Sequence, residues 1–362
     1  MKHKMVVAFV TFTMFGAVGV VGFTATATAA QPFGPATEHV SMTGTDSGSC
    51  VSSPCATINY AISVAPAGTT IKVAAGTYDQ TVDISKPISL KGAGASSTTI
   101  NGAGIDPGGT DYGVVYVGTT GGLTQIQGFT ITNPYTYAYT GGEPEAVALA
   151  DQNSSDSVDV VDNDIVEGSA DTNAGTDFPI GIDTFLNSAQ TVILDNTISG
   201  FFQGALLEDN GPATIQSNIF TNLISNSTSD PTTVYPAEGV FFLSDEAGSL
   251  TGQDAISNTF EDYSGYGVAM DAGYDNGDCS STPCNGSITG AITSNQFALT
   301  TGTPGAAAIS LSALDNGNDL TVTVNSDKGY VTSPSVGVSI SATGGGDISY
   351  SESGTKIKEH AA

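Results

Sequence analysis

The ten residues TVILDNTISG (191–200) contain the pattern that decides the fold. A short alternating apolar stretch is followed by an asparagine, one spacer residue and an isoleucine. Four other segments repeat this order, with Ile or Phe two residues after the asparagine: DVVDNDIVEG (159–168), ATIQSNIFTN (213–222), DAISNTFED (254–262) and GAITSNQFAL (290–299). The repeated asparagines are Asn163, Asn196, Asn218, Asn258 and Asn295. Recurrence of one short unit is the signature of a solenoid, in which each turn stacks on the next.

Two further segments fit the same frame less completely. TQIQGFTITN (124–133) has Gly128 at the expected asparagine position, and LTVTVNSDK (320–328) has Asn325 there. The asparagines are expected to stack at one bend of the coil, each amide bonded to the next. Gly128 would leave a gap in that row.

A second motif precedes each of these segments and consists of a small residue followed by an alternating strand. The small residues are Gly113, Ala146, Gly181, Gly204, Gly239, Gly267, Ala308 and Gly337. Because alternate strand residues face opposite ways, the residues one and three steps later should face inward, and those two and four steps later outward. In GVVYVG (113–118) this parity sends Val114 and Tyr116 inward and Val115 and Val117 outward.

The shortest complete period, Asn196 to Asn218, suits one turn of three short strands joined by tight bends. Helical repeats would show a 3.6-residue periodicity, which is absent. The sequence therefore predicts an all-β parallel β-helix with three strands per turn over residues 69–350. An open end would expose unpaired strand groups, and ATINYAISVAPAG (56–68) predicts a capping helix with Ile58, Ala61, Ile62 and Ala65 on one face. Residues 31–55 are expected to be a lead-in, and 351–362 a tail.

The run from PCATINYAIS through VAAGTYDQTVDISKPISLKGAG resembles the start of secreted right-handed parallel β-helix proteins of the pectate-lyase-like superfamily. The Asn-x-Ile/Phe units look like the β-helix repeats of that superfamily. The resemblance covers roughly residues 45–345 and implies the pectin lyase fold with a right-handed coil. It is specific for fold and not for function, because the superfamily includes lyases, hydrolases, esterases, epimerases and adhesins.

Residues 1–30 have the composition of a signal peptide: a basic start, an apolar run from Met5 to Phe23 and small residues near Ala30. An uncleaved membrane anchor is the alternative, because the run is long enough to span a bilayer. Cleavage would leave a secreted chain without membrane attachment, and a monomer is expected.

The net charge of −28 and the lack of arginine disfavour nucleic acid, acidic membranes and polyanionic sugars as partners.

All four cysteines fall in two copies of D-x-G-x-C-x-x-x-P-C, at 46–55 and 275–284. Disulfides Cys50–Cys55 and Cys279–Cys284 are expected in an exported chain. A metal site built from all four cysteines is the alternative, although the spacing is wider than in most zinc sites. The two loops either form a functional rim (a lip) beside the coil, or their disulfides act only as staples that hold protruding loops in shape.

The resemblance places substrates along the outward face of one sheet. On the strands that follow the small residues, the middle turns present Phe185, Leu206, Phe241 and Leu243 outward, together with the acids Asp183, Glu208 and Asp271. On adjacent turns Asp183 and Glu208 would be on the order of 8 Å apart at Cα, within the range used in glycoside hydrolysis. These acids are candidate catalytic groups, and they are equally well explained as solvated residues.

Two other features are candidates for ligand binding. In YTYAY (135–139), Tyr135, Tyr137 and Tyr139 share one strand face and form either a sugar-stacking platform or a packed hairpin. The acidic loop DNGND (315–319) offers oxygen ligands suited to calcium but matches no strict calcium motif.

The residues contain no complete catalytic set of the resembled enzymes. There is no arginine, and the lysines after residue 30 are Lys72, Lys86, Lys91, Lys328, Lys356 and Lys358. The histidines His39 and His360 are near the ends of the mature chain, whereas polygalacturonases carry a G-H-G segment. GTYDQTV and the stretch around Asp183 faintly resemble pectin methylesterases, whose G-R-P-W stretch is missing.

The leading hypothesis is therefore an exported, non-catalytic module that contacts glycans or other cell-envelope material. A polysaccharide-degrading enzyme and a purely structural surface protein are the alternatives.

Overall fold

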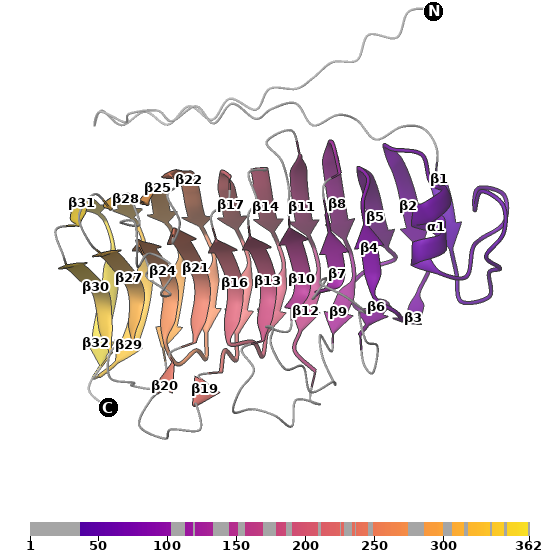
Figure 1. Ribbon diagram of the computed structural model, residues 1–362. Coiled ribbons are helices and arrows are strands. Elements are labelled where there is room, and N and C mark those ends of the chain that lie inside the picture. The colour runs from indigo at the N-terminus through magenta and orange to yellow at the C-terminus, as the bar shows by residue number, and fades with distance from the viewer. Residues whose placement is uncertain are drawn as a thin grey trace, which may run out of the picture. The chain divides into compact units, whose positions relative to one another are not determined.

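The computed structural model describes residues 37–102, 113–118, 120–132, 145–150, 156–168, 179–185, 190–208, 211–224, 226–227, 234–235, 237–244, 249–273, 286–299, 306–314, 318–333, 335–343 and 346–360. In these residues the backbone winds into a right-handed parallel β-helix with three strands per turn (Figure 1). The predicted fold class and the resemblance to pectin-lyase-like proteins are confirmed. No described helix is long and apolar enough to cross a membrane.

Three parallel sheets run along the coil, and we name each by its number of described strands. The nine-strand sheet contains β4 (Val82–Ile84), β7 (Gly113–Val117), β10 (Glu145–Ala150), β13 (Ile180–Phe185), β16 (Gln203–Glu208), β21 (Glu238–Ser244), β24 (Tyr266–Ala272), β27 (Ala307–Leu314) and β30 (Val336–Thr343). The eleven-strand sheet contains β1 (Thr37–Val40), β2 (Thr69–Val73), β5 (Ile88–Gly92), β8 (Leu123–Gln127), β11 (Ser157–Val161), β14 (Gln190–Leu194), β17 (Ala213–Gln216), β22 (Ser249–Ile256), β25 (Ser287–Thr293), β28 (Asp319–Asn325) and β31 (Asp347–Ser353). The ten-strand sheet contains β3 (Gly76–Asp79), β6 (Thr98–Asn101), β9 (Thr130–Thr132), β12 (Asp164–Val166), β15 (Thr197–Ser199), β18 (Ile219–Thr221), β23 (Thr259–Glu261), β26 (Gln296–Leu299), β29 (Lys328–Thr332) and β32 (Lys356–His360). An antiparallel pair, β19 (Asn226–Ser227) and β20 (Val234–Tyr235), stands apart from them.

The repeated asparagine occupies a two-residue bend between the eleven-strand and ten-strand sheets. In one turn β14 ends at Leu194, Asp195 has a left-handed φ of 56°, and Asn196 leads into β15. The residue before the asparagine adopts the same positive φ in the other turns, at Asp162, Ser217, Ser257 and Ser294. A short polar residue tolerates this conformation better than a branched one, which explains the Asp or Ser before each asparagine.

The five asparagines form the predicted ladder through their amide groups. Asn218 Oδ1 accepts hydrogen bonds from the backbone N and from Nδ2 of Asn196, at 2.9 and 3.0 Å. Asn218 Nδ2 donates to Asn258 Oδ1 at 3.0 Å and to the carbonyl oxygen of Ile193 at 2.9 Å. The same pattern links Asn163 to Asn196 and Asn258 to Asn295, and all five side chains are buried. Each buried amide is thus paired with the turns on both sides.

Both ends of the ladder differ from the prediction by one position. Register with Asn163 shows that Phe129, not Gly128, occupies the asparagine position, while Gly128 takes the left-handed conformation with φ 78°. At the other end Asp327, not Asn325, accepts from Asn295 N and Nδ2 at 2.8 and 2.9 Å. Residue type alone places Gly128 and Asn325 in line with the asparagines, whereas the bend is defined by the residue with positive φ, which is Gly128 in one turn and Ser326 in the other. The predicted gap is real, but Phe129 causes it.

Asp327 ends the ladder with a carboxyl group instead of an amide. Burial raises its pKa to about 6, although hydrogen bonds from Asn295 and from backbone amides favour the charged form. Among the described residues its Oδ2 has no hydrogen-bond partner. The last bonded position of the ladder is therefore sensitive to pH.

Replacing Asp327 with asparagine is expected to raise the free energy of unfolding by about 1–2 kcal/mol at pH 7.5 and by close to zero near pH 4. A carboxyl whose folded pKa is raised binds its proton more tightly in the folded state, so stability falls as pH rises from about 4 to about 6. Asparagine resembles the protonated group and removes that loss. Urea unfolding of both proteins across this pH range measures the difference. Asp319→Asn, at an exposed carboxylate of β28, removes the same charge, and an equal gain there would contradict the explanation.

A stack of phenylalanines fills the interior beside the ten-strand sheet. The ring centroids of Phe220, Phe260 and Phe297 are 5.0 and 5.1 Å apart, with interplanar angles of 8° and 7°. The stack explains three of the glycines of the second motif, Gly204, Gly239 and Gly267. A Cβ at Gly239 would lie 2.5 Å from ring atoms of Phe260, and Gly204 and Gly267 face the other two rings in the same way. Glycine and phenylalanine therefore share one layer of each of these turns.

The N-terminal end of the coil is covered by α1 (Ile58–Val64), which is shorter than the predicted 56–68. Its predicted apolar face is confirmed, because Ile58, Ala61, Ile62 and Ala65 are buried. Thr57 caps the helix by accepting a hydrogen bond from Tyr60 N at 3.2 Å.

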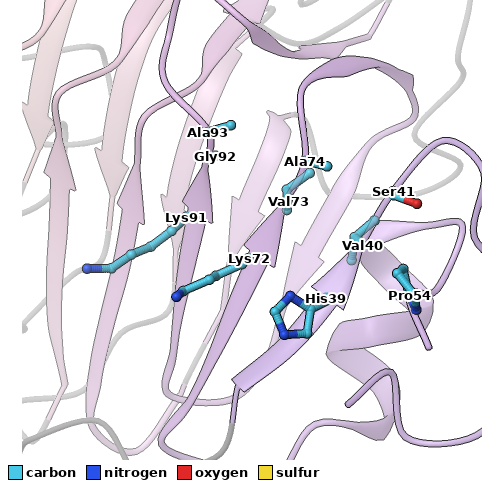
Figure 2. Close-up of a pocket in the computed structure, with 10 residues that line it drawn as sticks. All are labelled: His39, Val40, Ser41, Pro54, Lys72, Val73, Ala74, Lys91, Gly92 and Ala93. Carbon is cyan, nitrogen blue, oxygen red and sulfur yellow. The ribbon is translucent and has the colours of Figure 1, made fainter. Parts of the chain in front are cut away.

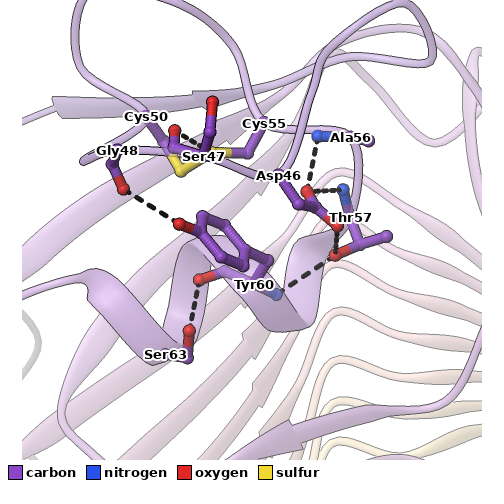
Figure 3. Close-up of a disulfide and its surroundings, with 9 residues drawn as sticks. All are labelled: Asp46, Ser47, Gly48, Cys50, Cys55, Ala56, Thr57, Tyr60 and Ser63. Carbon is purple, nitrogen blue, oxygen red and sulfur yellow. Dashed lines mark hydrogen bonds between the residues drawn. A yellow bond between two sulfur atoms is a disulfide. The ribbon is translucent and has the colours of Figure 1, made fainter.

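The first cysteine loop is joined to this cap (Figure 3). The disulfide Cys50–Cys55 is present, as predicted. Asp46 accepts hydrogen bonds from the backbone N of Ala56 and Thr57 at 2.8 and 2.9 Å, and from Thr57 Oγ1 at 2.8 Å. The loop therefore holds the start of the capping helix, which favours the staple over the lip. Cys279 and Cys284 lie outside the described residues.

Two predicted boundaries are wrong. The lead-in contains β1, which pairs with β2 as the first strand of the eleven-strand sheet. The expected tail after residue 350 contains the end of β31 and all of β32, which pair with β28 and β29. The coil therefore extends by one strand at each end beyond the predicted limits, β1 at the start and β32 at the end.

Candidate functional site

The outer face of the nine-strand sheet carries three rows of side chains, each made by equivalent positions on neighbouring strands. Strands within a sheet are about 4.8 Å apart, so members of one row are close neighbours. The first row contains Glu145, Ile180, Gln203, Glu238 and Tyr266. The second contains Asp183, Leu206, Phe241 and Ala269, and the third contains Glu208, Leu243, Asp271 and Ser312.

Several residues predicted to bind a ligand form one apolar cluster on this face. Leu206 and Leu243 are buried together with Ile180, separately from the interior of the coil, and Phe241 is half-buried against them. Phe185 is the last residue of β13, and its side chain lies outside the described residues. Tyr135, Tyr137 and Tyr139 also lie outside them.

The three predicted acids are spread over four strands of the outer face. Asp183 on β13 pairs with Leu206, so Glu208 is two residues further along the adjacent strand. Glu208 and Asp271 share a row with Leu243 between them, which makes their Cα separation about 10 Å from strand spacing alone. Asp183 is buried, whereas Glu208 and Asp271 are half-buried. The geometry brings these acids to one face but not into one compact group.

One strand has the opposite parity to the prediction. Val115 and Val117 of β7 pair with Val147 and Leu149 and belong to the interior, while Tyr116 pairs with outward Ala148. The parity of β7 was predicted on the assumption that Gly113 is equivalent to the small residue Ala146. In the structure Gly113 is in register with Glu145 instead. A shift of one residue exchanges the two faces of a strand.

Glu238 is the main outward-facing residue that the sequence analysis missed. Its Oε2 accepts a hydrogen bond from Gln203 Nε2 at 2.6 Å, and both side chains are 8% exposed. The parity pattern starts at the small residue of each strand, so it does not include the position before it. The signal was present, since Gln203, Glu238 and Tyr266 each stand directly before a glycine of the second motif.

The environment shifts the pKa of both Glu238 and Asp271 upward. Burial raises the pKa of Glu238 to about 8, and the nearby charge of Asp271 adds to the rise against the hydrogen bond from Gln203. Burial also raises the pKa of Asp271 to about 6, opposed by a hydrogen bond from Ser312. The pKa of Tyr266 is raised by burial and by both carboxylates. Near neutral pH the carboxyl of Glu238 is therefore mostly protonated, whereas that of Asp271 is mostly ionised.

This arrangement offers two kinds of chemistry. A protonated acid and an ionised carboxylate with separated pKa values can act as general acid and general base. The same carboxyls, together with an amide and an apolar cluster, can bind sugar hydroxyls and the apolar faces of sugar rings. Among the described residues no group of three His, Cys, Asp or Glu side chains is arranged to hold a metal ion. Of the DNGND loop only Asn318 and Asp319 are described.

Solved structures of low sequence identity are similar to this chain over most of its length. An alginate lyase from Paenibacillus sp. has 14% identity and a TM-score of 0.41, over 90% of this chain and 98% of that one. PfbA, a surface adhesin of Streptococcus pneumoniae, has 12% identity and a TM-score of 0.34, over 76% and 79%. Pectate lyase Pel9A has 12% identity and a TM-score of 0.33, over 85% and 78%. Similarity at this level concerns the fold alone.

The sequence comparisons agree with the fold. No curated protein matches the chain. The family model DUF1565, described as a protein of unknown function, matches residues 40–258, which is more than half of the chain and includes the cap, the first cysteine and most of the asparagine ladder. The chain belongs to the DUF1565 family.

Proposed function

We propose that this protein is exported and binds a neutral glycan, extracellular or in a cell envelope, on the outer face of the nine-strand sheet without cleaving it. The observation that carries the proposal is the half-buried Phe241, which lies on the cluster of Ile180, Leu206 and Leu243. Aromatic rings stack on the apolar faces of sugars, and carboxylates accept hydrogen bonds from their hydroxyl groups. Glu208 and Asp271 supply such groups in the row beside Phe241.

The charge of this face supports a neutral ligand. Asp183, Glu208, Glu238 and Asp271 lie on it, and the sequence has no lysine, arginine or histidine between Lys91 and Lys328. A polyanionic sugar would be repelled by the ionised carboxylates of this face, among them Asp271. The disulfide Cys50–Cys55 fits an oxidising, extracellular compartment.

The Phe241→Ala variant is expected to bind its glycan on the order of tenfold more weakly, because truncating a central aromatic contact removes both stacking and apolar area. A glycan array with neutral and acidic polysaccharides identifies the ligand, and calorimetry of wild type and variant measures the loss. Tyr330→Ala is the matched control, since Tyr330 is 38% exposed on β29 of the ten-strand sheet.

Absence of any array signal, or equal weakening by Tyr330→Ala, would contradict the proposal. Release of new reducing ends during the same incubations, lost in Glu238→Gln, would instead assign hydrolysis to Glu238 and Asp271. Unsaturated products would indicate a lyase. Silence in both binding and cleavage would favour a purely structural protein.

A further inference from the structure

A row of basic side chains lies on the outer face of the eleven-strand sheet, near the capped end. His39 on β1 is in register with Lys72 on β2, and Lys72 with Lys91 on β5. Because neighbouring strands are about 4.8 Å apart, the three residues form one short row. Lys72 and Lys91 extend in the same direction from adjacent strands, with the His39 ring beside Lys72 (Figure 2).

The row borders a pocket of about 430 Å³ at the carboxyl ends of these three strands. Ser41, Ala74 and Ala93, each directly after one of the strands, line it together with the cations (Figure 2). No acidic residue is among its lining residues. The size is typical of a small-molecule site, for which volumes of about 300–1,000 Å³ are usual.

The two ammonium groups of this row are unpaired within the part of the chain that the structure describes. No hydrogen bond or ion pair joins the ammonium group of Lys72 or Lys91 to a described residue, although the protein has 36 acidic residues. Lys86, close by in sequence, is different, because its Nζ donates to the carbonyl oxygens of Ser63 and Ala65 at 3.2 and 3.1 Å. Like charges directly opposite on neighbouring strands repel. An anion between them would relieve this repulsion.

The geometry points to a binding site for a phosphate monoester, such as a phosphorylated sugar, held by Lys72, Lys91 and His39. A phosphate monoester carries nearly two negative charges at neutral pH and three acceptor oxygens, so it can accept from several of these donors at once. A single carboxylate would neutralise only one of the lysines. The pocket volume leaves room for the organic group next to Ser41. The site lies on a different sheet from the proposed glycan face and does not depend on it.

Phosphorus NMR with the whole protein tests the site, with inorganic phosphate and glucose 6-phosphate as probes and galacturonate as a competitor, at constant ionic strength. Wild type is expected to broaden the signals of both phosphates, and glucose 6-phosphate should bind more tightly because it also fills the pocket. Lys72→Gln/Lys91→Gln should weaken binding on the order of tenfold or more, because two charge-assisted hydrogen bonds are lost. Lys328→Gln/Lys356→Gln removes the same charge at the other end of the coil and should leave binding unchanged.

Four results would overturn the inference. The first is the absence of phosphorus line broadening with wild type. The second is equal weakening in the two double variants, which would show attraction by net charge alone. The third is displacement of bound phosphate by galacturonate at equal concentration, which would assign the pocket to carboxylates. Tight binding of inorganic phosphate with no preference for glucose 6-phosphate would contradict the sugar phosphate as the ligand.

Discussion

Phe260→Ala is expected to lower the free energy of unfolding by about 3–5 kcal/mol, among the largest effects of any single substitution in this protein. Phe260 is fully buried at the centre of the stack, with Phe220 and Phe297 on either side at 5.0 and 5.1 Å. Tyr263 contacts its edge at a centroid distance of 6.4 Å. Alanine would remove the buried ring and leave a cavity that these rigid neighbours cannot fill.

Chemical denaturation followed by circular dichroism measures this loss. Ile219→Ala is the matched control, because Ile219 is on the adjacent strand β18 of the same sheet and is 43% exposed. Its loss should stay below about 1 kcal/mol, since an exposed side chain contributes little buried area. Comparable losses in the two variants would show that the stack does not hold neighbouring turns together.

Asn218→Ala is expected to cost a similar amount, about 3–5 kcal/mol, for a different reason. Alanine would leave two donors of Asn196 and two acceptors, Asn258 Oδ1 and the Ile193 carbonyl oxygen, without this buried partner. A buried polar group that loses its partner costs about 1–3 kcal/mol, and neighbouring losses add only in part. The substitution opens the ladder at its middle asparagine.

Gln216→Ala provides the control for this change, because Gln216 is an exposed amide two residues earlier on the same turn. Its effect should be within about 0.5 kcal/mol of zero. Hydrogen exchange supplies a second measurement, since amides of Asn196 and Asn163 should lose protection in Asn218→Ala and keep it in the control. Unchanged protection would mean that the ladder does not transmit stability between turns.

Much of the fold could be predicted because the same strand-and-asparagine unit recurs in several turns. Asn163, Asn196, Asn218, Asn258 and Asn295 are each followed, two residues later, by an inward Ile or Phe. The need for a buried amide at the bend and an apolar side chain in the interior therefore gives the same sequence pattern in each of these turns. The two wrongly assigned ladder positions are in turns where another residue replaces the asparagine. Phe129 and Asp327 occupy the ladder position without being asparagine, and only the register reveals them.

The candidate sites were harder to predict because they depend on contacts between turns. The outward parity of Phe241, Glu208 and Asp271 followed from strand alternation alone. The pairing of Gln203 with Glu238 and the raised pKa of Glu238 depend on burial and on neighbours from other strands. The basic row consists of His39, Lys72 and Lys91, which come from three different strands. The sequence around each of them gives no sign that they share a row.

The sequence by itself determined the coil, its three strands per turn, the buried amide ladder and the helix that caps its start. These features are local, because a few consecutive residues are enough to determine the strand periodicity and the left-handed bend before each asparagine. The tertiary structure alone decided which residues meet across turns: the glycines that make room for the phenylalanine stack, the neighbours that raise the pKa of Glu238, and the row of His39, Lys72 and Lys91. Such contacts depend on how consecutive turns are aligned, and a shift of one residue changes them all.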